Sequence, residues 1–257
     1  MFALILVDIW WVQPRLRPAW LVLVALAVAS HAYRGETPPK LGFRRANLRS
    51  CLVAVTPLLL GIAALALVLS LTFGTVRRVT PERLAVFVTY YCVWGLFQQY
   101  ALNGYFVNRF AAAAPGRRVR LVPPIAAGCF ALAHAPNWFL VGVTFGAGLL
   151  CAHFYLRYRN LYPLGLAHGL LGSVLFLTVP DAVSQHFYIG PAALRWQRAQ
   201  RELAATHSAT HSATGATCLA AQDRAHRGAR DHPFAIGCGD DAPPVAPRRV
   251  GERAQPR

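Results

Sequence analysis

Long apolar runs constrain this chain more than any other feature of its sequence. Each is long enough to cross the roughly 30 Å hydrocarbon core of a membrane, and four are uninterrupted: residues 20–33 with their flanks, 51–73, 84–107 and 161–179. A fifth run, 121–155, is too long for one helix and contains HAPN at 134–137, so we expect two helices there. The sequence predicts an all-α, polytopic integral membrane bundle of six or seven transmembrane helices.

Composition and the N-terminal segment agree with a membrane protein. Hydrophobic residues make up 55% of the 257 residues and charged residues only 14%, which is too apolar for an ordinary soluble domain. The opening MFALILVDIWWV is short and contains Asp8, and it has neither a basic n-region nor a small-residue cleavage site. We therefore interpret it as a short or re-entrant segment instead of a signal peptide.

The net charge of +16 raises the possibility of nucleic-acid binding. Most basic residues, however, fill short connections between apolar runs, as the positive-inside rule expects. One such loop contains Arg34, Lys40, Arg44, Arg45 and Arg49. A second contains Arg109, Arg117, Arg118 and Arg120. We expect these loops to face the cytoplasm of a bacterial cell, in its inner (plasma) membrane, and we expect no nucleic-acid partner.

The composition changes near residue 195. The remainder contains the repeat THSATHSATGAT and a Pro/Arg-rich end, and it lacks the apolar residues for a core. We predict a transmembrane domain over 1–194 and a disordered, basic, low-complexity tail over 195–257.

Polar side chains within the apolar runs are the candidate functional groups. His134 and His168 lie in separate runs, and ionisable groups inside a membrane are costly and therefore a functional-site hypothesis by default. Two imidazoles from separate helices could share a proton, a water or a metal ion. Asn137 either lines the same cavity or caps the next helix.

The order of the motifs resembles the CPBP family of intramembrane proteases, which includes the type II CAAX prenyl endopeptidases and bacteriocin-processing proteins. The motifs are a polar doublet followed by NGYF at 103–106, Phe130-x-x-x-His134, and FYLRYRNLYPLGLAHGLLG at 154–172. The similarity extends from about residue 40 to about residue 180. It implies a helical membrane enzyme that cuts its substrate within or beside the bilayer.

The resemblance implies roles for individual residues. The catalytic set it implies is Gln98, Gln99, His134 and His168, with the two amides at the positions of the family's glutamate pair. His134 and His168 would also be ligands of a divalent metal such as zinc. The substrate cavity would contain Asn103, at the position of an arginine, with Phe130, Asn137 and Gly172, the last where the family has a polar residue.

The implied site lacks a carboxylate. A neutral amide cannot accept a proton at useful pH, so Gln98 cannot act as a general base. None of the ten acidic residues lies between Arg83 and Pro180. Only Asp8 and Asp181, at the two ends of the apolar region, could reach inward.

Two functions of different classes follow. The first is a CPBP-like intramembrane endopeptidase, a CAAX prenyl protease-like metalloprotease with Gln in place of the catalytic glutamates. The alternative is a catalytically silent relative that binds or scaffolds a peptide, a lipid or a partner helix. Expected partners are therefore membrane lipid and a hydrophobic or prenylated peptide or a partner transmembrane helix. A transporter is a third class, but the sequence does not show the internal repeat that transporters often carry.

Overall fold

The structure is a computed structural model that describes residues 1–114 and 116–206. These residues form helices, turns and loops and no strand. The chain divides into two compact units, residues 1–201 and 202–257. The elements of the first unit, in chain order, are α1 (Phe2–Val7), the π-helix η1 (Asp8–Val12), η2 (Arg17–Ala19), α2 (Trp20–Tyr33), α3 (Leu48–Thr72), α4 (Pro81–Gln99), the π-helix η3 (Tyr100–Val107), α5 (Asn108–Ala113), η4 (Gly116–Leu121), α6 (Val122–Leu132), α7 (Trp138–Tyr158), α8 (Leu161–Thr178), α9 (Asp181–Ser184) and η5 (Gln185–Phe187).

Three helices in the described part of the chain are long and apolar enough to cross a membrane: α3, α7 and α8. Three other expected spans fall short for separate reasons, and the first of these, α6, has only 11 residues. The α2 helix has only 14 residues, and α4 carries polar residues at both ends, Glu82 and Arg83 at its start and two glutamines at its end. The described residues are therefore all-helical, and their long apolar helices are those of an integral membrane protein, as expected.

The α3 helix presents apolar side chains to its surroundings. Its exposed residues include Val53, Leu60, Leu65, Val68 and Leu71. An exposed apolar face of this extent would be a liability in water. It is suited to contact with lipid chains.

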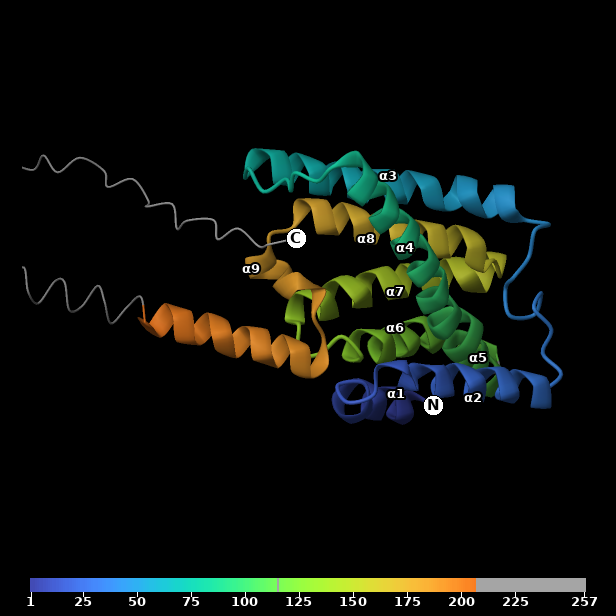
Figure 1. Cartoon of the computed structure of the whole chain (residues 1–257). Coiled ribbons are helices and arrows are strands. Elements are labelled where there is room, and N and C mark those ends of the chain that lie inside the picture. Colours follow the sequence, from blue (N-terminus) through green and yellow to red (C-terminus); the bar gives the residue numbers. More distant parts are fainter. Residues whose placement is uncertain (115, 207–257) are drawn as a thin grey trace, which may run out of the picture. The chain divides into compact units, whose positions relative to one another are not determined.

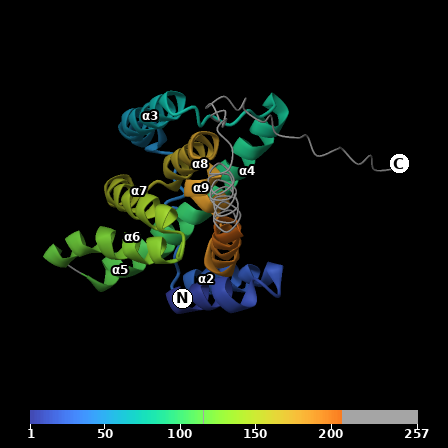
Figure 2. The ribbon, with the colours of Figure 1, turned by 90° about the vertical axis from the view of Figure 1, so that its left-hand side faces the viewer.

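The helices α4 and α8 approach each other so closely that glycine is required at the contact. A Cβ added to Gly165 would lie 2.7 Å from Leu96 Cα, and one added to Gly169 would collide with the backbone of Cys92. Small residues allow this kind of backbone approach between membrane helices. Both views of the ribbon show α8 between α3 and α7, and in Figure 1 α4 runs obliquely across it (Figures 1 and 2).

The predicted interruption at 134–137 is confirmed. The α6 helix ends at Leu132, and a turn containing a cis Ala135–Pro136 peptide bond leads to α7. Asn137 begins α7, because its Oδ1 accepts a hydrogen bond from the Leu140 backbone N–H at 3.1 Å. Its Nδ2 donates to the carbonyls of Ser184 and Tyr188, at 2.9 and 3.1 Å, and so fixes the segment that follows α8.

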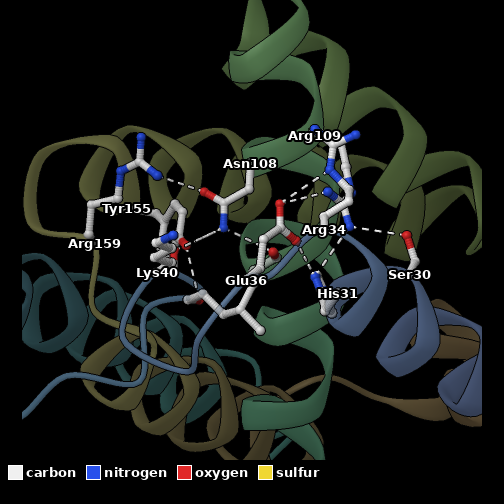
Figure 3. A network of polar contacts seen from close by, with 11 residues as sticks. Ser30, His31, Arg34, Glu36, Lys40, Asn108, Arg109, Tyr155 and Arg159 are labelled. Carbon is white, nitrogen blue, oxygen red and sulfur yellow. Dashed lines mark hydrogen bonds and ion pairs between the residues drawn. The ribbon is translucent and has the colours of Figure 1, made fainter.

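A network of polar contacts fixes the loop between α2 and α3 (Figure 3). The Glu36 carboxylate accepts hydrogen bonds from His31 Nδ1 at 2.6 Å and from Arg109 Nη1 at 2.7 Å. Farther along the loop, Tyr155 Oη donates to the Leu41 carbonyl at 3.0 Å. Asn108 links the Tyr155 hydroxyl to the end of α7. The loop is thus tied to α5 and α7.

The predicted tail is described only in part. Residues 190–206 are helical, which includes the first twelve residues of the predicted tail, 195–206. Gln197 of this helix donates from its Nε2 to the Gln185 side chain at 2.9 Å. Residues 207–257 lie outside the described residues, so disorder there stays a prediction.

Candidate functional site

A chain of hydrogen bonds joins two amides to one of the predicted histidines. Asn103 Nδ2 donates to Gln99 Oε1 at 2.6 Å, and Gln99 Nε2 lies 3.0 Å from His168 Nδ1. Both amide side chains are fully buried. Because the Gln99 oxygen already accepts from Asn103, its NH₂ group is the donor to His168. In this arrangement the proton of a neutral His168 imidazole lies on Nε2.

The backbone between the two amides is a π-helix. Gln99 ends α4, and η3 begins at the next residue and continues to Val107. π-Helical turns are frequent at functional sites. Asn103 Oδ1, within this turn, is buried without a hydrogen-bond partner in the described part of the chain.

His134 has its orientation fixed by its own helix. It lies just past the end of α6, is 9% exposed, and its Nδ1 lies 2.8 Å from the Phe130 carbonyl oxygen. Since a carbonyl can only accept, Nδ1 carries the proton and Nε2 keeps a free lone pair in the neutral imidazole. His134 can therefore accept a hydrogen bond or bind a metal through Nε2.

The Phe130 ring contacts both imidazoles. The ring centroids of Phe130 and His134 are 4.9 Å apart, and those of Phe130 and His168 are 6.1 Å apart, both in edge-on geometry. Among residues 1–114 and 116–206, no hydrogen bond joins the two histidines directly. The motif residues thus gather in one region but form two groups.

A cavity of about 200 Å³ lies beside the group that contains Phe130 and His134. Gln98, Phe130 and His134 line it from the core helices, and α2 and the N-terminal helices α1 and η1 complete its wall with mainly apolar side chains. Gln98 forms no side-chain hydrogen bond with any other described residue, so its amide is available to a ligand. The cavity therefore combines a mainly apolar surface with the His134 imidazole and the free Gln98 amide.

The other predicted residues lie elsewhere. Gln99, Asn103 and His168 are behind the cavity wall and do not line it. Asn137 is occupied as the cap of α7. Gly172 does not line the cavity either, because it packs against the ring of Tyr91, 2.6 Å from the position of an added Cβ.

The sequence allowed Asp8 to reach inward but did not place it in the site. Asp8, at the start of η1, lines the cavity and is only 7% exposed. Its only signal in the sequence is a carboxylate within an otherwise apolar segment. Because Asp8 is far along the chain from the motifs, the sequence did not predict that it lines the same cavity as Gln98 and His134.

The residues present form an incomplete set for a catalytic metal. A catalytic zinc takes three protein ligands, and the described residues contain no group of three His, Cys, Asp or Glu arranged to hold a metal. His134 is suited to be a metal ligand through Nε2, since its other ring nitrogen, Nδ1, donates a hydrogen bond to a carbonyl. His168 does not, because Gln99 donates to its Nδ1 where a metal-bound imidazole would itself donate. The two-histidine metal site stays a prediction.

The fold and the site define a helical membrane protein with an apolar cavity that carries amide and imidazole groups. The family model of type II CAAX prenyl endopeptidase Rce1-like proteins matches residues 80–174. That segment runs from the start of α4 into α8 and contains both glutamines and both histidines. The resemblance to the CPBP family is thereby confirmed. No curated protein and no solved structure matches the chain.

Proposed function

We propose that the protein is a CPBP-like intramembrane endopeptidase of the CAAX prenyl protease type, with Gln98 and Gln99 at the positions of the catalytic glutamates. The observation that carries the proposal is the state of His134, whose Nε2 lone pair is free within an apolar cavity. This nitrogen accepts a hydrogen bond from a water molecule. The neighbouring Gln98 amide donates to the carbonyl oxygen of the peptide bond, where negative charge develops.

The apolar lining of the cavity favours a hydrophobic substrate. A prenylated peptide or the end of a partner transmembrane helix presents apolar surface to such a wall and enters from the lipid. We place the protein in the bacterial inner membrane with six or seven spans, where α2, the α4–η3 segment and α6 supplement the three long apolar helices and the N-terminal α1–η1 segment would be the seventh.

A second candidate is a catalytically silent relative that binds such a peptide, a lipid or a partner helix without cleaving it. It is favoured by the use of Gln99, whose oxygen and nitrogen are both engaged with Asn103 and His168. A side chain used in this way stabilises the packing of η3 against α8. It has no group left for chemistry.

Peptidase assays on the full chain separate the two candidates. The purified protein is incubated in lipid vesicles with a prenylated and a transmembrane test peptide, and products are measured by mass spectrometry. The endopeptidase proposal expects cleavage that His134→Ala abolishes. The silent relative expects no cleavage but retained peptide binding, and it expects Gln98→Glu to raise activity above background, because this change adds a carboxylate beside His134.

Elemental analysis of the same preparation tests the metal prediction independently. Stoichiometric zinc that is lost in His134→Ala would support a metal held in the cavity. A metal content that does not depend on His134 would remove that role from the residue.

A further inference from the structure

The cavity contains one carboxylate, and it comes from outside the matched segment. Asp8 begins the π-helix η1, two helices upstream of the family motifs. It lines the same cavity as Gln98 and His134. The core of the site, from Arg83 to Pro180, has no acidic residue of its own.

Asp8 also differs from the other acidic residues of the described chain in being buried without a partner. Glu36 is paired with His31 and Arg109, and Asp181 accepts two hydrogen bonds from Arg77. Glu82 and Glu202 are exposed. Asp8 is 7% exposed, yet its carboxyl group forms no hydrogen bond or ion pair within residues 1–114 and 116–206.

An unpaired buried carboxyl group is costly, because no protein group replaces the hydration it loses. A structural role does not account for Asp8, since its side chain bonds nothing that it would hold in place. The side chain instead contributes a proton acceptor to a cavity whose other polar lining groups include an amide and an imidazole. Titratable groups in such environments are candidates for chemistry.

We propose that Asp8 supplies the carboxylate that the family-matched core lacks and acts as the general base of the cavity. The inference rests on the endopeptidase proposal and names the residue that activates water. A carboxylate oxygen of Asp8 takes one proton from water while the water oxygen forms a bond to the carbonyl carbon of the substrate. When the C–N bond breaks, Asp8 returns the proton to the leaving amine.

In this arrangement His134 and Gln98 act as orienting groups. His134 Nε2 accepts the second hydrogen of the water, and the Gln98 NH₂ group donates to the carbonyl oxygen. The N-terminal helices are then part of the site, and the chemistry requires both the N-terminal segment and the matched core.

Three variants of the full chain test the proposal in the peptidase assay. Asp8→Asn keeps the shape but removes the base, and it should lower kcat/KM at least about 100-fold. Asp8→Glu keeps a carboxylate and should retain part of the activity. Glu82→Gln is the matched control, because it removes an exposed carboxylate that does not line the cavity, and it should not change the rate.

Chemical labelling gives a readout that does not depend on turnover. Dicyclohexylcarbodiimide is apolar and modifies carboxyl groups in apolar surroundings, forming an adduct that peptide mapping locates. We expect labelling at Asp8 but not at Glu82, and we expect the test peptide to protect Asp8 when it fills the cavity. In Asp8→Asn the adduct should be absent from this segment.

The outcomes distinguish failure of this inference from failure of the proposed function. If the unmodified protein and Asp8→Asn cleave equally fast, the endopeptidase stands and Asp8 is not its base. If the unmodified protein does not cleave, the endopeptidase and a catalytic Asp8 both fail. Labelling that the peptide does not block would show that Asp8 lies outside the substrate cavity and would overturn the inference by itself.

Discussion

Gln99 Nε2 lies 3.0 Å from His168 Nδ1, and this contact joins the end of α4 to the middle of α8. It exists because the two helices meet through glycines that bring their backbones together. A wider separation would leave room for another side chain between the amide and the imidazole. The geometry of the site thus depends on helix packing as much as on the polar residues themselves.

The first prediction concerns the two adjacent glutamines. Gln99→Leu removes the partner of both Asn103 Nδ2 and His168 Nδ1 in a buried place, so it should lower the free energy of unfolding by about 1–3 kcal/mol. Gln98→Leu is the matched control, because Gln98 faces the cavity without a hydrogen bond to a described residue, and it should have a much smaller effect. Thermal unfolding in detergent measures the stability of both variants. Equal destabilisation would contradict the assignment of the structural role to Gln99.

A second prediction tests the close contact of α4 and α8. Gly169→Ala places a methyl group against the backbone of Cys92 and should destabilise the protein by about 1–3 kcal/mol. Gly142→Ala in α7 is the control, because nothing lies within 4 Å of its added Cβ. That variant should stay within roughly 1 kcal/mol of the unmodified protein. A neutral Gly169→Ala would show that the helices are farther apart.

The positions of the helices could be predicted from the sequence to a large extent. Apolar run length located α2, α3 and α8, and the Pro and Asn of HAPN located the break between α6 and α7. The π-helix η3 could not be predicted, since the run 84–107 is apolar throughout apart from its amides. A change from α to π geometry leaves no distinct pattern in such a run.

The residues of the site could be predicted from the sequence only in part. Motif order indicated that a glutamine and His168 lie close together, but the choice between Gln98 and Gln99 depends on the rotation of α4, which the sequence does not specify. Asn137 had two equally good interpretations, as a helix cap and as a cavity residue. The position of Asp8 depends on how the N-terminal segment packs against α2 and η3, long-range contacts for which no local pattern exists.

A third prediction concerns the tail. Deleting residues 202–257 should leave membrane insertion and folding intact, because the apolar helices and all candidate site residues lie upstream, in the first compact unit. Fluorescence-detected size-exclusion chromatography of the truncated and full-length proteins compares their folded fractions. Deleting residues from 190 onward is the contrasting variant, because it also removes the Gln197 contact with Gln185. Loss of folded protein in the shorter deletion would show that the tail belongs to the fold.

The last prediction follows from the charge of Glu36, which lies outside the spanning helices. Partial burial raises the pKa of this carboxyl group, but the hydrogen bond from His31 and the charges of Arg109, His31 and Arg34 together hold the pKa below its ordinary value of 4.5. A carboxyl group with a lowered pKa in the folded state stabilises the protein above its ordinary pKa, and this stabilisation is lost as the pH falls through the lowered value. Melting temperatures in detergent, measured from neutral pH to well below 4.5, should therefore fall in the acid range. Glu36→Gln removes the titrating group, so this variant should be less stable at neutral pH and should lose less stability on acidification. Parallel curves for the two proteins would contradict a stabilising charge on Glu36, whereas convergence at low pH would place the acid sensitivity in its contacts with His31 and Arg109.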